Sequence, residues 1–203
     1  MGGVASLIDE VIDHSLGECL RARAFVRKRR TFYRTREGVV GLVAVQASVS
    51  NTAGAGKFTV NVGLFFPAID EVVNGRKLTG LPTEPECTIR SRLGLLMPLA
   101  QDVWWTIDES VDRLQLAEEV SKAWREFGQP WLDRHEEPLA AQQHLLKWGQ
   151  FREAAAFSLL RKDSTGASQI LEKGIASTRD PVFQSMIKSW ARSKGLALAA
   201  RTT

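Results

Sequence analysis

The sequence has little of the material from which metal centres and catalytic triads are commonly built. Its 203 residues include two cysteines and three histidines. Cys19 and Cys87 lie far apart, outside any Cys-x-x-Cys or Cys/His cluster, so no thiolate zinc site is expected. His135 and His144 do not have the spacing of about four residues that two ligands on one helix face need. No Gly-x-Ser-x-Gly motif is present. The sequence therefore predicts no catalytic residue, metal or cofactor, and it disfavours an enzyme.

Long apolar runs are missing as well. The longest, residues 39–45 and 60–68, fall well short of the roughly 18 residues that a membrane span needs. The N-terminus leads directly into Asp9, Glu10 and Asp13, without the basic stretch and apolar core of a signal peptide. Two cysteines that no disulfide framework requires fit a reducing compartment. We therefore expect a cytoplasmic protein that does not use a membrane.

Outside the N-terminal third, the sequence has no net excess of positive or negative charge. Residues 1–66 hold nine Lys/Arg against five Asp/Glu, whereas residues 67–203 hold 18 of each. The excess concentrates in residues 21–36, whose centre is the run Arg27, Lys28, Arg29 and Arg30. Such a segment can neutralise nucleic-acid phosphates, but only Phe32 and Tyr33 accompany it as stacking platforms. We favour a solvated turn over a nucleic-acid site.

The order of hydrophobic patterns predicts an α+β fold. Apolar residues at helical spacing predict a helix over residues 4–20. Strands are expected over residues 31–35, 39–48, 57–66, 87–92 and 102–107. The Gly- and Pro-containing residues 68–86 indicate a long loop, and helical patterns follow. This segregation favours an antiparallel sheet of about four to five strands packed against the N-terminal helix and the following helices. We expect a core domain of residues 1–138 and an all-helical C-terminal extension of residues 139–203.

Polar residues inside the strands form the most informative set. A short turn between their strands would place Gln46 and Asn61 opposite each other, and Arg90 and Arg92 share one face by the period-two rule. With Tyr33, these side chains would form a surface suited to a carboxylate or phosphate, which arginine can bind bidentately. In the alternative interpretation, the amides satisfy backbone groups and the arginines pair with acidic residues of the helices.

Several short motifs occur in an order that resembles a known family. They are RTFYR at residues 30–34, a β-branched run ending at Gln46, FTVNVG at 58–63, CTIRSRLG at 87–94 and the pair Trp104-Trp105. Together with GQPWL at 128–132, they resemble the bacterial family called domain of unknown function 4304, over roughly residues 4–132. The chain departs from that pattern at Ala24-Phe25, where the family often has Leu-Gly-Phe, and in its helical tail. The resemblance implies an α+β domain and supplies no activity. It suggests that Gln46, Asn61, Arg90 and Arg92 belong to one pattern.

Three functions follow from these observations, in order of preference. The first is a non-enzymatic cytoplasmic protein that binds another protein, with an immunity-like or accessory role as an analogy to other small α+β bacterial proteins. The second is a site for a small anion, or an enzymatic site, on the sheet at the paired arginines. The third is nucleic-acid binding through residues 21–36. A protein is the expected partner, a small anion comes second and nucleic acid last.

Overall fold

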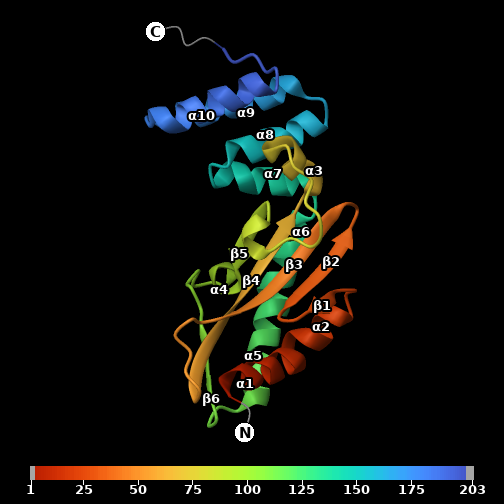
Figure 1. Cartoon of the computed structure of the whole chain (residues 1–203), viewed down its shortest axis with the longest axis vertical. Coiled ribbons are helices and arrows are strands. Elements are labelled where there is room, and N and C mark those ends of the chain that lie inside the picture. Colours follow the sequence, from red (N-terminus) through yellow and green to blue (C-terminus); the bar gives the residue numbers. More distant parts are fainter. Residues whose placement is uncertain (1–2, 200–203) are drawn as a thin grey trace. The chain divides into compact units, whose positions relative to one another are not determined.

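The computed structural model describes residues 3–199 (Figure 1). The described residues form two compact units. The first comprises Met1–Phe65 with Thr79–Glu136, and the second comprises Phe66–Leu78 with Glu137–Thr203, apart from the few terminal residues outside the described range. The second unit is therefore discontinuous in sequence. The domain limits expected from the sequence place residues 66–78 in the core, whereas the compact units place them with the C-terminal helices.

An antiparallel sheet organises the first unit. Within the described residues its strands are β1 (Val26–Lys28), β2 (Thr31–Arg36), β3 (Val39–Ala47), β4 (Ala55–Phe65), β5 (Ile89–Arg92) and β6 (Trp105–Asp108). They follow the order β1-β2-β3-β4-β5, and β6 also pairs with β4. The 11 residues of β4 are enough to pair with β6 at one end and with β5 at the other. The predicted α+β fold is confirmed, with the short edge strand β1 in addition to the expected strands.

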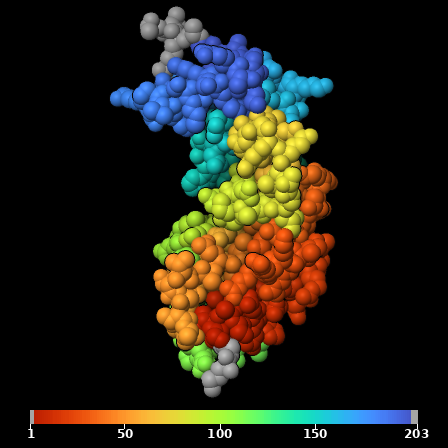
Figure 2. Space-filling view, viewed as in Figure 1, coloured from red at the N-terminus to blue at the C-terminus, as the bar shows by residue number. Residues whose placement is uncertain are grey.

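Two long helical segments cover one face of this sheet. The first runs through α1 (Val4–Ile12), the π-helical η1 (Asp13–Gly17) and α2 (Glu18–Arg21), and Figure 2 shows α1 in red at the surface. The second runs through α5 (Arg113–Ala123), the π-helical η3 (Trp124–Gly128) and α6 (Gln129–His135). Alternate side chains of β4 face these helices and are fully buried: Phe58, Val60, Val62 and Leu64. The helix expected over residues 4–20 is present, and its π-helical turn inserts one residue into the register.

Two short helices lie in the connections of the first unit. The 3-10 helix η2 (Glu84–Glu86) precedes β5, and α4 (Leu93–Leu96) follows it. Thr83 and Glu86 form a capping box on η2, which fixes the path of the chain into β5. Gly94 lets the chain close on itself after β5, because a Cβ there would lie 2.6 Å from the Val103 nitrogen.

The second unit is helical. It contains α3 (Pro67–Asn74), α7 (Pro138–Lys147), α8 (Phe151–Leu160), α9 (Ser164–Ala176) and α10 (Pro181–Ser193). The prediction of a long loop over residues 68–86 is wrong in its first part, which is the helix α3. Pro67 begins this helix, and Gly75 ends it with a left-handed φ of 68°. The α3 helix packs against the C-terminal helices. The Phe66 and Phe157 rings meet edge to face at 5.1 Å, and Trp190 Nε1 donates to the Val73 carbonyl at 3.2 Å.

Candidate binding site on the open face of the sheet

The polar residues singled out in the sequence lie on the sheet face that points away from α1 and α5. Asn61 is paired with Ala44 on one side and with Arg92 on the other. In the neighbouring row, Gly63 is paired with Leu42 and Arg90, and Leu42 is paired with Tyr33. Since strand residues two positions apart share a face, Tyr33, Gln46, Asn61, Arg90 and Arg92 all belong to this face. We call it the open face because α1 and α5 lie on the other side, although parts of it, such as Leu42 and Thr59, are buried.

The register between β3 and β4 differs from the expected one. Gln46 is paired with Thr59, not with Asn61. The reason lies in the connection between the strands, where the side chain of Asn51 bonds both the Lys57 nitrogen, at 2.9 Å, and the Lys57 carbonyl, at 3.1 Å. In a tighter hairpin these backbone groups of Lys57 would bond a residue of the facing strand. Because the Asn51 side chain bonds them instead, the turn is longer than expected. The prediction that the two amides stand directly opposite each other is therefore wrong.

The two amides nevertheless meet as diagonal neighbours. Asn61 Nδ2 donates to Gln46 Oε1 at 3.0 Å. Asn61 is only 4% exposed, whereas Gln46 is exposed. Among residues 3–199 the Gln46 amide NH₂ has no hydrogen-bond partner, so Asn61 orients a side chain that still has free donors.

Arg92 belongs to a set of four residues that we call the Trp104 cluster: Lys57, Arg92, Asp102 and Trp104. The Arg92 guanidinium forms an ion pair with Asp102 and lies 5.4 Å from the centroid of the Trp104 ring. Trp104 Nε1 donates to Asp102 at 3.1 Å, and Lys57 Nζ lies 5.5 Å from the ring centroid. The hydrogen bond from Arg92 lowers the pKa of Asp102, and the bond from Trp104 adds to this effect. The indole is thus held by both its edge and its face.

Arg90 lies in a different environment from Arg92. Its guanidinium donates to Glu84 Oε1 at 2.9 Å, and its row of the open face is covered by Cys87. A Cβ on Gly63 would lie 2.6 Å from Cys87 Sγ, so the glycine makes room for this thiol. Burial raises the pKa of Cys87 to about 12 and also raises the pKa of Tyr33. The structure therefore brings Gln46, Asn61 and Arg92 together and places Arg90 and Tyr33 one row away.

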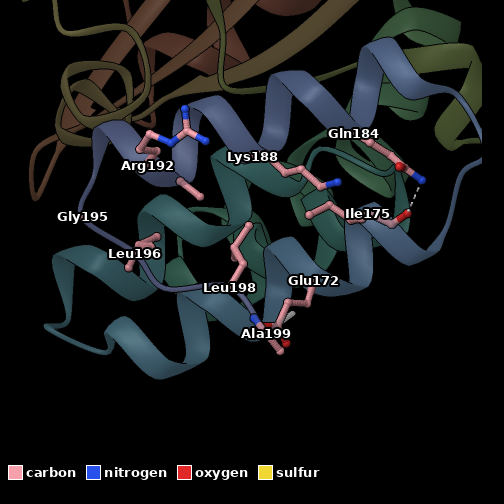
Figure 3. Close-up of a pocket in the computed structure, with 10 residues that line it drawn as sticks. Glu172, Ile175, Gln184, Lys188, Arg192, Gly195, Leu196, Leu198 and Ala199 are labelled. Atoms are coloured by element: carbon pink, nitrogen blue, oxygen red, sulfur yellow. Dashed lines mark hydrogen bonds between the residues drawn. The ribbon is translucent and has the colours of Figure 1, made fainter. Parts of the chain in front are cut away.

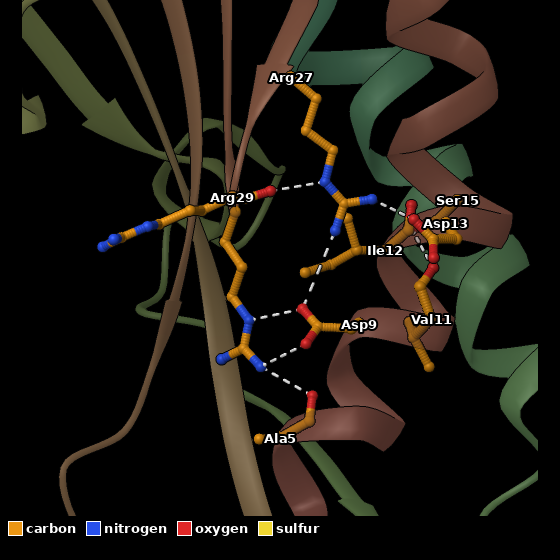
Figure 4. A network of polar contacts seen from close by, with 9 residues as sticks. Ala5, Asp9, Val11, Ile12, Asp13, Ser15, Arg27 and Arg29 are labelled. Carbon is orange, nitrogen blue, oxygen red and sulfur yellow. Dashed lines mark hydrogen bonds and ion pairs between the residues drawn. The ribbon is translucent and has the colours of Figure 1, made fainter.

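Half of the basic run lies in ion pairs with the first helix. Arg27 pairs with Asp13 and approaches Asp9 at 3.9 Å, as Figure 4 shows. Arg30 Nε donates to Asp9 at 2.7 Å, and this hydrogen bond lowers the pKa of the carboxyl. Lys28 and Arg29 have no ion pair among the residues that the structure describes. Much of the positive charge that suggested nucleic-acid binding is thus balanced within the first unit.

A buried arginine extends this pattern of charge balance on the helix-covered face. The side chain of Arg34 is 4% exposed and lies between Asp133, at 3.0 Å, and Glu136. Arg23 also bonds Asp133, at 2.5 Å. The Arg34 guanidinium stacks 4.7 Å from the Phe25 ring. Arg34 attaches α6 to β2, Arg23 attaches it to the turn after α2, and both are part of the framework of the first unit.

Trp104 and the segment before it are not among the site residues that the sequence predicts. Neighbouring residues in a strand point to opposite faces, so the pair Trp104-Trp105 must divide between them. Trp105 is 8% exposed and stacks on Phe58 with ring centroids 5.8 Å apart, whereas Trp104 faces the open side. In the segment between Gly94 and Val103, Leu95 of α4 is 46% exposed and Leu99, in the loop after α4, is 79% exposed. The sequence shows these leucines only as a short apolar run over residues 95–99, and such runs usually indicate residues of the hydrophobic core.

Comparisons with known proteins identify a family and nothing more specific. No curated protein and no solved structure matched the chain. Within residues 3–199, no helix is both long and apolar enough to cross a bilayer. One family model, described as Domain of unknown function (DUF4304), matches residues 16–134, which include the whole of the open-face site. Because this match covers more than half of the sequence, the chain belongs to the family of the domain of unknown function 4304.

Proposed function

We propose that the first unit is a non-enzymatic binding module of a bacterial cytoplasmic protein, and that it binds a protein partner on the open face of its sheet. The observation that carries the proposal is Trp104, which is half-buried and is held over Arg92 and Lys57 beside a loop with exposed leucines. Tryptophan and arginine are the residue types most often found at energetic centres of protein interfaces. Cys19 and Cys87 are free thiols, which suits the proposed compartment.

Preorganisation supports this function. Asp102 bonds both Arg92 and Trp104 Nε1, so the two large side chains are ordered before a partner arrives. Binding to such a surface costs less side-chain entropy than binding to mobile residues. Leu95 and Leu99 add exposed apolar area in the segment that leads to Trp104, and the free amide donors of Gln46 add a polar contact. The combination resembles the apolar centre and polar rim of an interface.

A small anion is less well supported as the ligand. Arg92 already pairs with Asp102, and Arg90 already pairs with Glu84. These carboxylates already balance the charge of both guanidinium groups, so an anion gains less from either arginine than it would from an unpaired one. A protein surface can use Trp104 and the leucines while leaving these ion pairs intact.

Site-specific photo-crosslinking in the native host tests the proposal. A photoreactive amino acid replaces the exposed Gln46, and in a control chain it replaces Lys122, which is exposed on α5 over the other face. We expect one protein to crosslink from position 46 and not from position 122. That protein is then purified and its affinity for the wild-type chain is measured.

Variants decide whether the captured protein uses the proposed surface. Trp104→Ala should weaken binding by roughly 30-fold, the effect of removing an interface hot spot of about 2 kcal/mol. Trp148→Ala is the matched control, because Trp148 is 67% exposed in the second unit. Equal crosslinking from both positions, or an affinity insensitive to Trp104→Ala, would contradict the proposal.

A further inference from the structure

A cavity of about 800 Å³ lies between α9 and α10 in the second unit (Figure 3). Its apolar lining comes from Ile175, Ala191, Leu196 and Leu198. One end lies near the connection between the helices, where Gln184 Nε2 donates to the Ile175 carbonyl at 3.1 Å and to the Thr178 carbonyl at 2.8 Å. The volume lies within the range of roughly 300–1,000 Å³ that small-molecule sites occupy.

The segment after α10 forms one wall of this cavity. Gly195 turns the chain with a left-handed φ of 67°, and the Leu196 nitrogen bonds the Ala191 carbonyl at 3.0 Å. The chain then crosses to α9, where the Ala199 nitrogen donates to Glu172 Oε1 at 2.7 Å. Leu196 and Leu198 are half-buried in this segment. The wall is therefore an apolar strap that continues directly from the end of α10 and is attached to α9 by the hydrogen bond from Ala199, so a ligand can pack beneath it.

The charges at the cavity are unbalanced. Lys188 and Arg192 lie four residues apart on α10, and therefore on one side of the helix. Both line the cavity and are exposed. Among the described residues neither has an ion pair, in contrast to Arg90 and Arg92 in the first unit. Glu172 is the acidic residue of the lining, and its Oε1 accepts the hydrogen bond from Ala199.

We propose that this cavity binds a small amphipathic carboxylate with an acyl chain. The carboxylate lies between Lys188 and Arg192, which supply charge-assisted hydrogen bonds. The acyl chain packs on Ile175 and Ala191 beneath the strap leucines. An apolar lining with a few polar groups at one side is the usual construction of a ligand site. This site is independent of the protein-binding surface proposed for the first unit.

Isothermal titration calorimetry of the full chain with decanoate tests the proposal, below the concentration at which decanoate forms micelles. We expect one molecule to bind per chain, and decanol to bind at least tenfold more weakly. The double variant Lys188→Gln/Arg192→Gln should weaken decanoate binding about tenfold or more, equivalent to about 1.4 kcal/mol. The control Lys162→Gln/Arg179→Gln removes the same charge from exposed positions of this unit outside the cavity, and it should bind like the wild type.

Hydrogen exchange supplies a measurement that does not depend on a variant. Decanoate should slow exchange in residues 195–199 and in the last turns of α10, while exchange in β3 and β4 stays unchanged. Absence of binding by the wild-type chain would overturn the proposal, and so would unchanged exchange in the strap. Equal affinity for decanoate and decanol, or for the two double variants, would overturn the assignment of the carboxylate to Lys188 and Arg192.

Discussion

Replacing Gly63 by alanine should destabilise the first unit by a steric clash with Cys87. The added Cβ would lie 2.6 Å from Cys87 Sγ and 2.9 Å from Cys87 Cβ. Overpacking of this kind costs about 1–3 kcal/mol, and replacing a strand glycine returns about 0.5–1 kcal/mol. We therefore expect Gly63→Ala to lower the free energy of unfolding by about 1–2 kcal/mol. Gly54→Ala is the control, because a Cβ there meets nothing within 4 Å.

A double-mutant cycle tests the cause of this loss. Cys87→Ala removes Sγ but leaves the contact at 2.9 Å, so the double variant should recover part of the stability, with a coupling of about 1 kcal/mol. Because the chain has two compact units, unfolding in urea is followed by hydrogen exchange of peptides from β4 and β5. Additive effects of the two substitutions would refute the idea that Cys87 packs directly on Gly63.

Three further predictions concern charge and reactivity in the first unit. Arg34→Leu should lower the free energy of unfolding by about 2–3 kcal/mol, which is less than the roughly 3–5 kcal/mol expected when a buried charge loses its partner completely, because Asp133 keeps Arg23 as a partner. The control Arg36→Leu changes a side chain that is 59% exposed, and in the same urea titration it should lower the free energy of unfolding by less than about 0.5 kcal/mol. The pKa of Asp102 is lowered in the native chain, so its ionised form stabilises the native cluster above the unfolded pKa of about 3.9, and this contribution is lost as the pH falls through the lower native value. The fluorescence of Trp104, isolated by difference from a Trp104→Phe chain, should therefore change only below about pH 3.9. A transition near pH 5 would count against the hydrogen bond from Arg92. The pKa of about 12 at Cys87 predicts that a Cys19→Ser chain resists iodoacetamide at pH 8 until urea unfolds it, whereas rapid modification of the native chain would show that the thiol is accessible and ionised.

Most strands of the sheet could be predicted, because the alternation of apolar and polar residues along a strand reflects the different burial of its two faces. Residues 57–66 alternate in the sequence, and β4 is the central strand that pairs with three others. The edge strand β1 gave no such signal, since all its residues are exposed. The helix α3 was missed for a different reason. The glycines and prolines of residues 68–86 favour a loop, although a proline at the start and a glycine after the end, here Pro67 and Gly75, are typical of a helix.

The candidate site was only partly predictable. The period of two correctly places Gln46, Asn61, Arg90 and Arg92 on one face. The register depended on the Asn51 side chain, which bonds Lys57 across the turn, and no hydrophobic pattern reports such a bond. The carboxylate partners of the arginines come from the 3-10 helix η2 before β5 and from the loop before β6. Which strand residues these carboxylates reach depends on tertiary packing, which local sequence does not record.

The helix α3 changes what the family region can be on its own. The family match over residues 16–134 includes α3, but α8 and α10, which contact it, lie beyond that match. A fragment that ends at Glu136 would retain every motif of the family and yet leave Ile69 and Val73, now 1% and 9% exposed, without their apolar cover. Such a fragment should be prone to self-association. The C-terminal helices therefore share one hydrophobic core with α3, a helix that lies inside the region matched by the family.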